Sequence, residues 1–205
     1  MNNFSAFTRF SALLLAFAFL LTACDSNDPE PMGGAGEMEV ISNVQMALTP
    51  QGGGAPFTAE AVFNESSVQT SIDPVNLTAG TVYNVEFTFL NRFEDDPEEL
   101  NEEITEEEDI AHQLFVIPEG GVADDLTISN RNNDRENQPL GTSFTLTVGD
   151  AADSGILRVV LRHYEGDSDA LVIEQKGDDL DPTDVEIPDV VENDVNIEFA
   201  ATIAN

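Results

Sequence analysis

The sequence predicts an all-β protein, namely an antiparallel, immunoglobulin-like β-sandwich of about seven or eight strands with one short acidic helix in a loop. From residue 38 onward, apolar and polar residues alternate with a period of two, which places successive side chains on opposite faces of half-buried strands. Turns rich in Gly, Pro, Asn and Asp separate these short segments, as in sandwiches. Thirteen Phe and no Trp supply the bulk of the core.

The first strands are expected at residues 38–48, 57–63 and 83–89. In 38–48, Val40, Val44 and Met46 share one face, and the Gly- and Pro-containing segment 51–56 turns the chain into the second strand as a hairpin. Residues 73–80 form a turn-rich approach to the third strand, which has the clearest alternation. One face of this strand is therefore expected to pack in the core and the other to face solvent.

Five further strands are expected at residues 113–117, 142–148, 156–163, 170–175 and 195–203. In the segment 156–163, Leu157, Val159 and Leu161 share one face and two arginines lie on the other. In 195–203, apolar and polar residues alternate almost to the end of the sequence. We expect no second domain after it.

One segment departs from the strand pattern. Asp96-Pro97 followed by Glu98 and Glu99 combines an N-cap residue, a proline at the first helical position and acids near the helix N-terminus. These signals predict a short, mostly solvated helix over residues 97–110, in which Leu100, Ile104 and Ile110 anchor it to the sandwich.

The N-terminus predicts export and lipidation. Arg9 precedes an apolar block, residues 12–21, that is too short for the roughly 20 residues of a membrane-spanning helix but suits a signal-peptide core. The run Leu21-Thr22-Ala23-Cys24 resembles the bacterial lipoprotein lipobox, whose cysteine is acylated and becomes the new N-terminus. The expected organisation is a lipoprotein signal peptide (1–23), a flexible Pro- and Gly-rich tether (24–37) and a β-sandwich domain (38–205). An ordinary secretory signal or an uncleaved anchor is the alternative.

The chain is strongly acidic, with 40 Asp and Glu against seven Lys and Arg and a net charge of −33. Such a chain repels phosphate backbones, so nucleic acid is excluded as a partner. The diffuse acid excess favours a surface adapted to high salt, where repulsion between carboxylates is screened, over loops that bind cations. Cys24 is the only cysteine, so no intrachain disulfide can form.

Two acidic segments are candidates for cation binding. The predicted helix carries carboxylates three and four residues apart, and the loop 177–184 is a candidate calcium loop. Neither has the spacing of a known calcium motif, and solvated acidic surfaces are the structural alternative. The loop's candidate calcium ligands are Asp178, Asp179, Asp181 and Asp184.

The two histidines form the other candidate site. His112 opens one predicted strand, and His163 closes another in phase with its core residues. If these strands are antiparallel neighbours, the two imidazoles meet at one end of the sandwich. A carboxylate from Glu108, Asp109 or Glu165 would then complete a two-histidine, one-carboxylate site of the type that holds Zn, Cu or Fe. The alternative is a pair of core histidines that donate to backbone carbonyls.

Catalysis has no support in the sequence. It lacks the Gly-x-Ser-x-Gly, His-Glu-x-x-His and glycine-rich phosphate-binding motifs, and Cys24 is assigned to lipidation. We therefore expect no enzyme activity and no required cofactor.

Four segments resemble a group of Bacteroidota envelope lipoproteins: residues 52–56, 73–83, 103–115 and 160–163. Members of this group are sometimes labelled with a type 1 periplasmic-binding fold, which is α/β, whereas the strand pattern here lacks βαβ alternation and favours the all-β prediction. The group has no established functional residues. The resemblance implies a lipoprotein of the outer membrane, facing either the periplasm or the cell surface, with an outer-membrane transporter of an uptake system as a candidate partner.

Two functional classes follow. The first, which we favour, is a membrane-anchored binding or accessory module that uses loops at one end of the sandwich. The second is a passive structural lipoprotein on the surface of a halophile.

Overall fold

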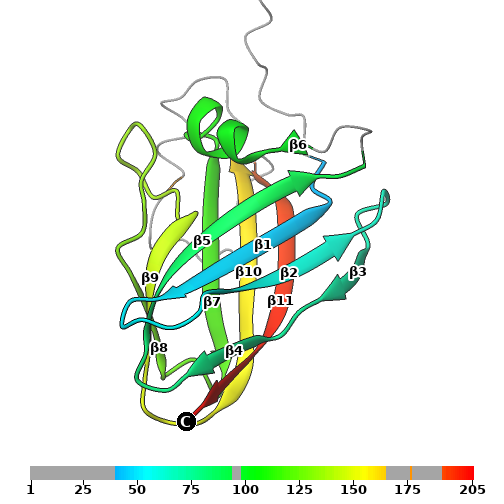
Figure 1. Ribbon diagram of the computed structural model, residues 1–205. Helices are drawn as coiled ribbons and strands as arrows, with labels where there is room; N and C mark the ends of the chain where they lie inside the picture. The colour runs from blue at the N-terminus through cyan, green and yellow to red at the C-terminus, as the bar shows by residue number, and fades with distance from the viewer. Residues whose placement is uncertain (1–39, 94–97, 165–175, 177–190) are drawn as a thin grey trace, which may run out of the picture. The chain divides into compact units, whose positions relative to one another are not determined.

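The computed structural model describes residues 40–93, 98–164, 176 and 191–205, which belong to a compact unit formed by residues 35–205. The described strands lie in two sheets that face each other (Figure 1). The all-β sandwich predicted from the alternation is confirmed, and no βαβ unit occurs among the described residues. No helix of the described part is long and apolar enough to cross a membrane.

The larger sheet has seven strands. Their order is β3-β2-β1-β5-β9-β8, with the two-residue strand β6 paired to β5. The strands are β1 (Asn43–Pro50), β2 (Phe57–Phe63), β3 (Gln69–Ile72), β5 (Val82–Asn91), β6 (Glu98–Glu99), β8 (Leu126–Ser129) and β9 (Ser143–Val148).

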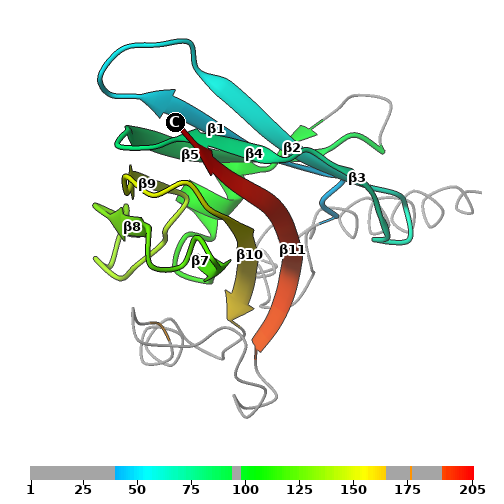
Figure 2. The same ribbon diagram turned by 90° about the horizontal axis from the view of Figure 1, so that it is seen from below.

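The smaller sheet has four strands in the order β4-β11-β10-β7. They are β4 (Val75–Thr78), β7 (His112–Gly120), β10 (Ser154–Tyr164) and β11 (Val191–Ala204). The sequence predicted an antiparallel sandwich. In the structure, however, β11 pairs with β4 in parallel, so the sandwich is not purely antiparallel. Figure 2 shows β10 and β11 running side by side along this sheet.

The core lies between the sheets and follows the predicted alternation. Val44, Met46 and Leu48 of β1 are buried together with Phe87 and Phe89 of β5, whose rings stack with centroids 6.3 Å apart. Burying one such side chain contributes about 1.5–3 kcal/mol. The smaller sheet contributes its own alternate residues from β7, β10 and β11 to the same cluster.

The predicted helix over 97–110 is wrong in extent. Glu98 and Glu99 pair with Asn91 and Leu90 as β6, so the cap and proline signals precede a strand. Among the described residues of this segment, one turn of π-helix, η1 (Glu103–Glu107), follows. The predicted anchors Leu100, Ile104 and Ile110 are all buried.

Strand boundaries also differ from the prediction in particular places. Val40 is 57% exposed and lies before β1, so the first strand starts later than residue 38. The turn-rich approach 73–80 contains β4, whose Val75 and Leu77 are buried. The predicted strand 170–175 lies outside the described residues.

Candidate metal centre

His112 and His163 are direct neighbours across β7 and β10. The two strands are antiparallel, and their register pairs His163 with His112. The ring centroids are 4.6 Å apart and the rings are inclined by 50°. Both residues are buried, at 0% and 3% exposure. The structure therefore brings the two imidazoles together at one end of the smaller sheet, as the strand-end argument predicted.

The backbone around η1 fixes the orientation of the His112 ring. Nδ1 of His112 lies 3.0 Å from the backbone oxygen of Glu108, the C-cap residue directly after η1. A carbonyl oxygen can only accept, so Nδ1 is the donor and Nε2 of the neutral ring carries the lone pair. A backbone carbonyl bound to the second ring nitrogen is the usual support of a metal-ligating histidine.

Asp194 is the third member of the cluster, and a β-bulge places it there. In the pairing of β10 with β11, Leu161 is opposite Val195 and Arg162 is opposite Asn193, so Asp194 is the extra residue of the bulge. Its side chain is fully buried, with Oδ2 3.6 Å from Nε2 of His112 and Oδ1 4.0 Å from Nδ1 of His163. Strict alternation would place Asp194 on the face opposite to Val195; the bulge turns it toward the histidines.

Glu108 borders the same pair. One ligand atom from each of Glu108, His112 and His163 lies within 4.8 Å of the others. Two neighbouring ligands of a tetrahedral zinc ion, with bonds of 2.0–2.1 Å, are roughly 3.3 Å apart. The distances from the Asp194 oxygens to the two histidine nitrogens are longer than hydrogen bonds and also longer than the separation of neighbouring zinc ligands. Binding of one ion would therefore require these side chains to move closer together.

The donor set decides which ions suit the site. Two imidazole nitrogens and carboxylate oxygens, without sulfur, match Zn²⁺ or Cu²⁺. Calcium prefers six to eight oxygen ligands, which this cluster does not offer. The ligand-bearing ends of β7, β10 and β11 are held by strand pairing, so the donors are positioned by rigid elements.

Asp109, the predicted alternative ligand, is engaged elsewhere. Its Oδ1 lies 2.6 Å from Nη1 of Arg135, and its Oδ2 accepts the backbone N–H of Arg135 at 2.7 Å. The structure thus pairs this carboxylate with a cation and not with the histidines. The remaining predicted site residues lie outside the described residues: Cys24, Glu165, Asp178, Asp179, Asp181 and Asp184.

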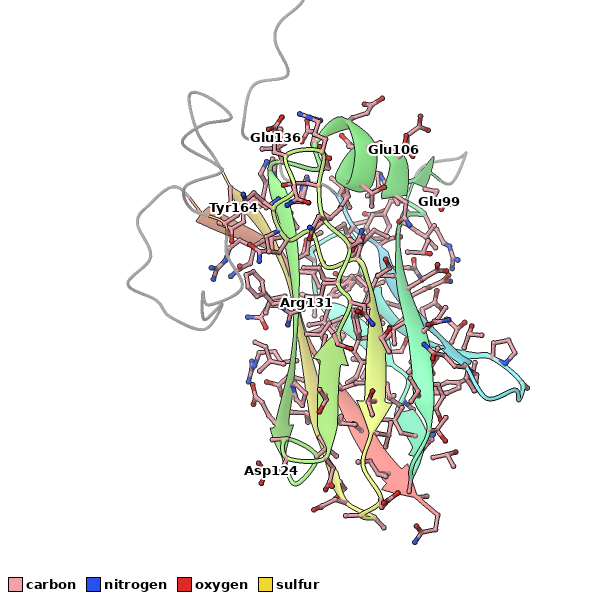
Figure 3. The ribbon with its side chains drawn as sticks, turned by 90° about the vertical axis from the view of Figure 1, so that its left-hand side faces the viewer. Glu99, Glu106, Asp124, Arg131, Glu136 and Tyr164 are labelled. Atoms are coloured by element: carbon pink, nitrogen blue, oxygen red, sulfur yellow. The ribbon has the colours of Figure 1, made fainter. Side chains whose placement is uncertain are left out.

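The outer face of the same sheet end is also buried. Tyr164 lies at the end of the molecule that carries Glu106 and Glu136, far from Asp124 (Figure 3). Its hydroxyl donates to Oε1 of Gln113 at 2.9 Å. Burial raises the pKa of Tyr164 to about 12. The histidine pair is therefore flanked on the opposite face by a water-excluded polar pair.

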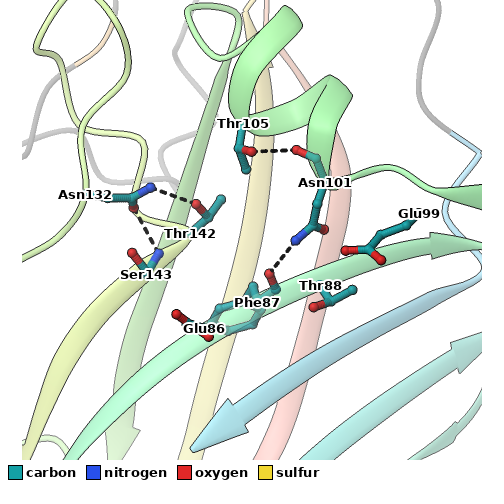
Figure 4. A pocket seen from close by; sticks show the side chains of 9 residues that line it. All are labelled: Glu86, Phe87, Thr88, Glu99, Asn101, Thr105, Asn132, Thr142 and Ser143. Carbon is teal, nitrogen blue, oxygen red and sulfur yellow. Dashed lines mark hydrogen bonds between the residues drawn. The ribbon is translucent and has the colours of Figure 1, made fainter.

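A shallow polar pocket lies at another place, between β5, β9 and the segment before η1 (Figure 4). Its Asn101 amide donates to the backbone oxygen of Phe87, and the Asn132 amide donates to Oγ1 of Thr142. These amides join neighbouring segments of the chain. The pocket contains the carboxylates Glu86 and Glu99 and no basic side chain, so it offers no counter-charge for an anionic ligand.

Sequence reasoning missed Asp194 and the buried position of Lys176. Asp194 directly precedes the alternating segment 195–203, and this proximity is the one signal that the sequence contained. Comparison of the chain with protein-family models, with curated proteins and with solved structures finds no match.

Proposed function

We propose that this chain is a lipid-anchored protein of the bacterial outer membrane that binds one divalent transition-metal ion through His112, His163 and Asp194. It is an accessory binding module whose ligand is the metal itself, and a passive structural role is the alternative. The observation that carries the proposal is the direct pairing of His112 with His163 at a bulge that brings a buried carboxylate to the same point.

The protein environment supports binding of a resident ion. His112 is held by the Glu108 carbonyl, and the ligand atoms are buried. A buried site with its ligands on paired strands changes shape little when the ion arrives or leaves. Glu108 supplies a further carboxylate for coordination. The anchor at Cys24 would hold this ion-binding domain at the membrane, and two acyl chains give stable attachment.

The test is metal binding by the purified chain. Elemental analysis of protein prepared without added metal comes first, followed by chelator treatment and calorimetric titration with Zn²⁺ and Cu²⁺. We expect one ion per chain and a rise in Tm with metal, because an ion that binds only the folded state stabilises it.

Two conservative variants and one control make the test specific. In His112→Asn the amide can still donate to the Glu108 carbonyl, but Nε2 is gone; His163→Gln removes the second ring. Each should lower affinity at least about tenfold. Tyr164→Phe changes a buried polar residue next to His163 and should bind the ion like the wild type. Equal affinity of the double histidine variant and the wild type would assign the binding to surface carboxylates and contradict the proposal.

A further inference from the structure

Lys176 is the only lysine of the chain, and it is buried against a carboxylate. Its Nζ lies 2.6 Å from Oδ2 of Asp134, and both side chains are fully buried. Nζ also donates to the backbone oxygen of Asp109 at 3.0 Å. The amine and the carboxyl group are thus held in contact, at residues 42 positions apart in the sequence and away from bulk water.

The two oxygens of Asp134 have different surroundings. Oδ1 accepts the backbone N–H of Glu136 at 3.0 Å and that of Gln138 at 2.8 Å, whereas Oδ2 faces the amine. Two backbone donors on one oxygen polarise the carboxyl carbon and stabilise negative charge that develops on that oxygen. The turn is closed by a hydrogen bond from Asn137 N to the backbone oxygen of Asp134. The carboxyl group therefore presents a polarised carbon beside the amine.

The burial of Lys176 acts against the charged form of its amine. Burial lowers the pKa of the Lys176 ammonium, while Asp134 and Asp109 act in the opposite direction. A proton that moves from Nζ to Oδ2 converts the buried ion pair into an amine and a carboxylic acid, which removes the cost of two buried charges. The Asp109 carboxylate, which is paired with Arg135, also lies near the amine.

We propose that Nζ of Lys176 and Cγ of Asp134 become joined by an intramolecular isopeptide bond. The lone pair of the neutral amine attacks Cγ of the protonated carboxyl group, and Oδ1 carries the negative charge of the tetrahedral intermediate. Nζ gives up one proton, Oδ2 receives it, and the C–Oδ2 bond breaks to release water. One amine and one carboxylic acid become one amide and one water, with no oxidant and no external reactant.

The bond would give the domain a covalent cross-link that its cysteine content cannot supply. With a single cysteine, the chain forms no intrachain disulfide. A cross-link between residues 134 and 176 closes a loop of the unfolded chain and so reduces the entropy gained on unfolding. This cross-link does not depend on the metal binding proposed for His112, His163 and Asp194.

The test uses peptide mass spectrometry of the full chain after complete unfolding in guanidinium and digestion with trypsin. Cleavage after arginines leaves the linked product as peptide 132–135 joined to peptide 163–205, uncut at Lys176 and about 18 Da lighter than the sum of the two, because one water is lost. Without the bond, trypsin cuts after Lys176 and releases 132–135, 163–176 and 177–205 separately. Separate peptides in full yield would overturn the proposal.

Two variants locate the bond. Lys176→Met and Asp134→Ala should each abolish the joined peptide, whereas Glu136→Gln changes a neighbouring carboxylate and should retain it. A loss of water that persists in Lys176→Met would assign it to another residue and contradict the proposal. If these variants fold poorly, labelling of the unfolded wild type decides: an amine-reactive reagent should leave Lys176 unmodified, and full labelling of its side chain would contradict the bond.

Discussion

Oδ2 of Asp194 lies 3.6 Å from Nε2 of His112, although the two residues are on strands that are not hydrogen-bonded to each other. β10 lies between β7 and β11. The bulge at Asp194 directs its carboxylate across the β10 strand, beside His163, toward His112. A side chain in this position has the charge that a metal ion bound by two neutral imidazoles would need. Asp194 therefore provides a test of the centre apart from the histidines.

We expect Asp194→Asn to weaken Zn²⁺ binding at least about tenfold, because the shape of the side chain is kept while its charge is lost. Glu198→Gln is the matched control, since Glu198 lies on the same strand and binds Arg158. Both variants lose one negative charge, so calorimetric titration separates a local from a general electrostatic effect. Similar affinities for the two variants would exclude Asp194 as a ligand.

Tyr164 gives a stability prediction with a definite pH dependence. Its pKa is raised by burial to about 12, above the ordinary value of 10. Below pH 10 the tyrosine is neutral in the folded and unfolded states; between pH 10 and 12 only the unfolded state loses the proton. The free energy of unfolding should fall over this range, by up to about 2–3 kcal/mol from this group.

The comparison with Tyr164→Phe isolates this effect. At pH 8 the variant should be about 1–3 kcal/mol less stable in urea unfolding, because the buried hydrogen bond from Tyr164 to the Gln113 oxygen is lost. From pH 10 to 12, stability should fall less steeply in the variant than in the wild type. Parallel pH profiles would show that Tyr164 does not have a raised pKa.

Gly141 sets the approach of a loop to β7 next to the histidine pair. Its φ is +81°, and a Cβ at this position would overlap the backbone oxygen of Leu114. Gly141→Ala should therefore destabilise the protein by at least about 1–3 kcal/mol, which a thermal or urea unfolding measurement would detect. Gly52→Ala is the control, because a Cβ there meets nothing within 4 Å. A near-neutral Gly141→Ala would mean that the loop adjusts freely.

The alternation in the sequence predicted the sandwich because burial of one strand face dominates the choice of residues. It predicted β2 at its observed bounds, but missed β3, which is mostly exposed, and β4, which begins beside a proline. The helix was predicted too long because an N-cap signal does not show whether the following residues pair with a strand. The residues at the predicted helix start form β6, which pairs with β5. Hydrogen bonding to strands that are distant in the sequence therefore determines the secondary structure of these segments.

The histidine pair followed from the same reasoning, since the ends of antiparallel neighbours meet. Asp194 did not, because it is the extra residue of a bulge in β11, opposite Leu161 and Arg162 of β10, and the bulge reverses the face expected from alternation. The Lys176–Asp134 contact joins segments with no periodic pattern in common, so only the three-dimensional structure shows it.

The acidity of the chain predicts a salt response. The residues after the predicted signal peptide carry six basic against 40 acidic side chains. Repulsion among them should lessen as NaCl rises from about 10 mM to 1 M and the Debye length falls from about 30 Å to 3 Å. We expect Tm to rise accordingly. A flat response, or stabilisation by millimolar Ca²⁺ well beyond that of NaCl at equal ionic strength, would favour specific cation sites instead.

Membrane attachment should depend on Cys24. The lipobox-like run predicts that acylation of this residue supplies the apolar anchor once residues 1–23 are removed. Cys24→Ala should therefore shift the protein from the detergent-rich to the aqueous phase in phase partitioning, or leave it as an uncleaved precursor. Ser26→Ala changes a nearby tether residue without altering the acylated position and should partition like the wild type. A mature-sized Cys24→Ala protein that still partitions with the detergent would show that another segment holds the chain at the membrane.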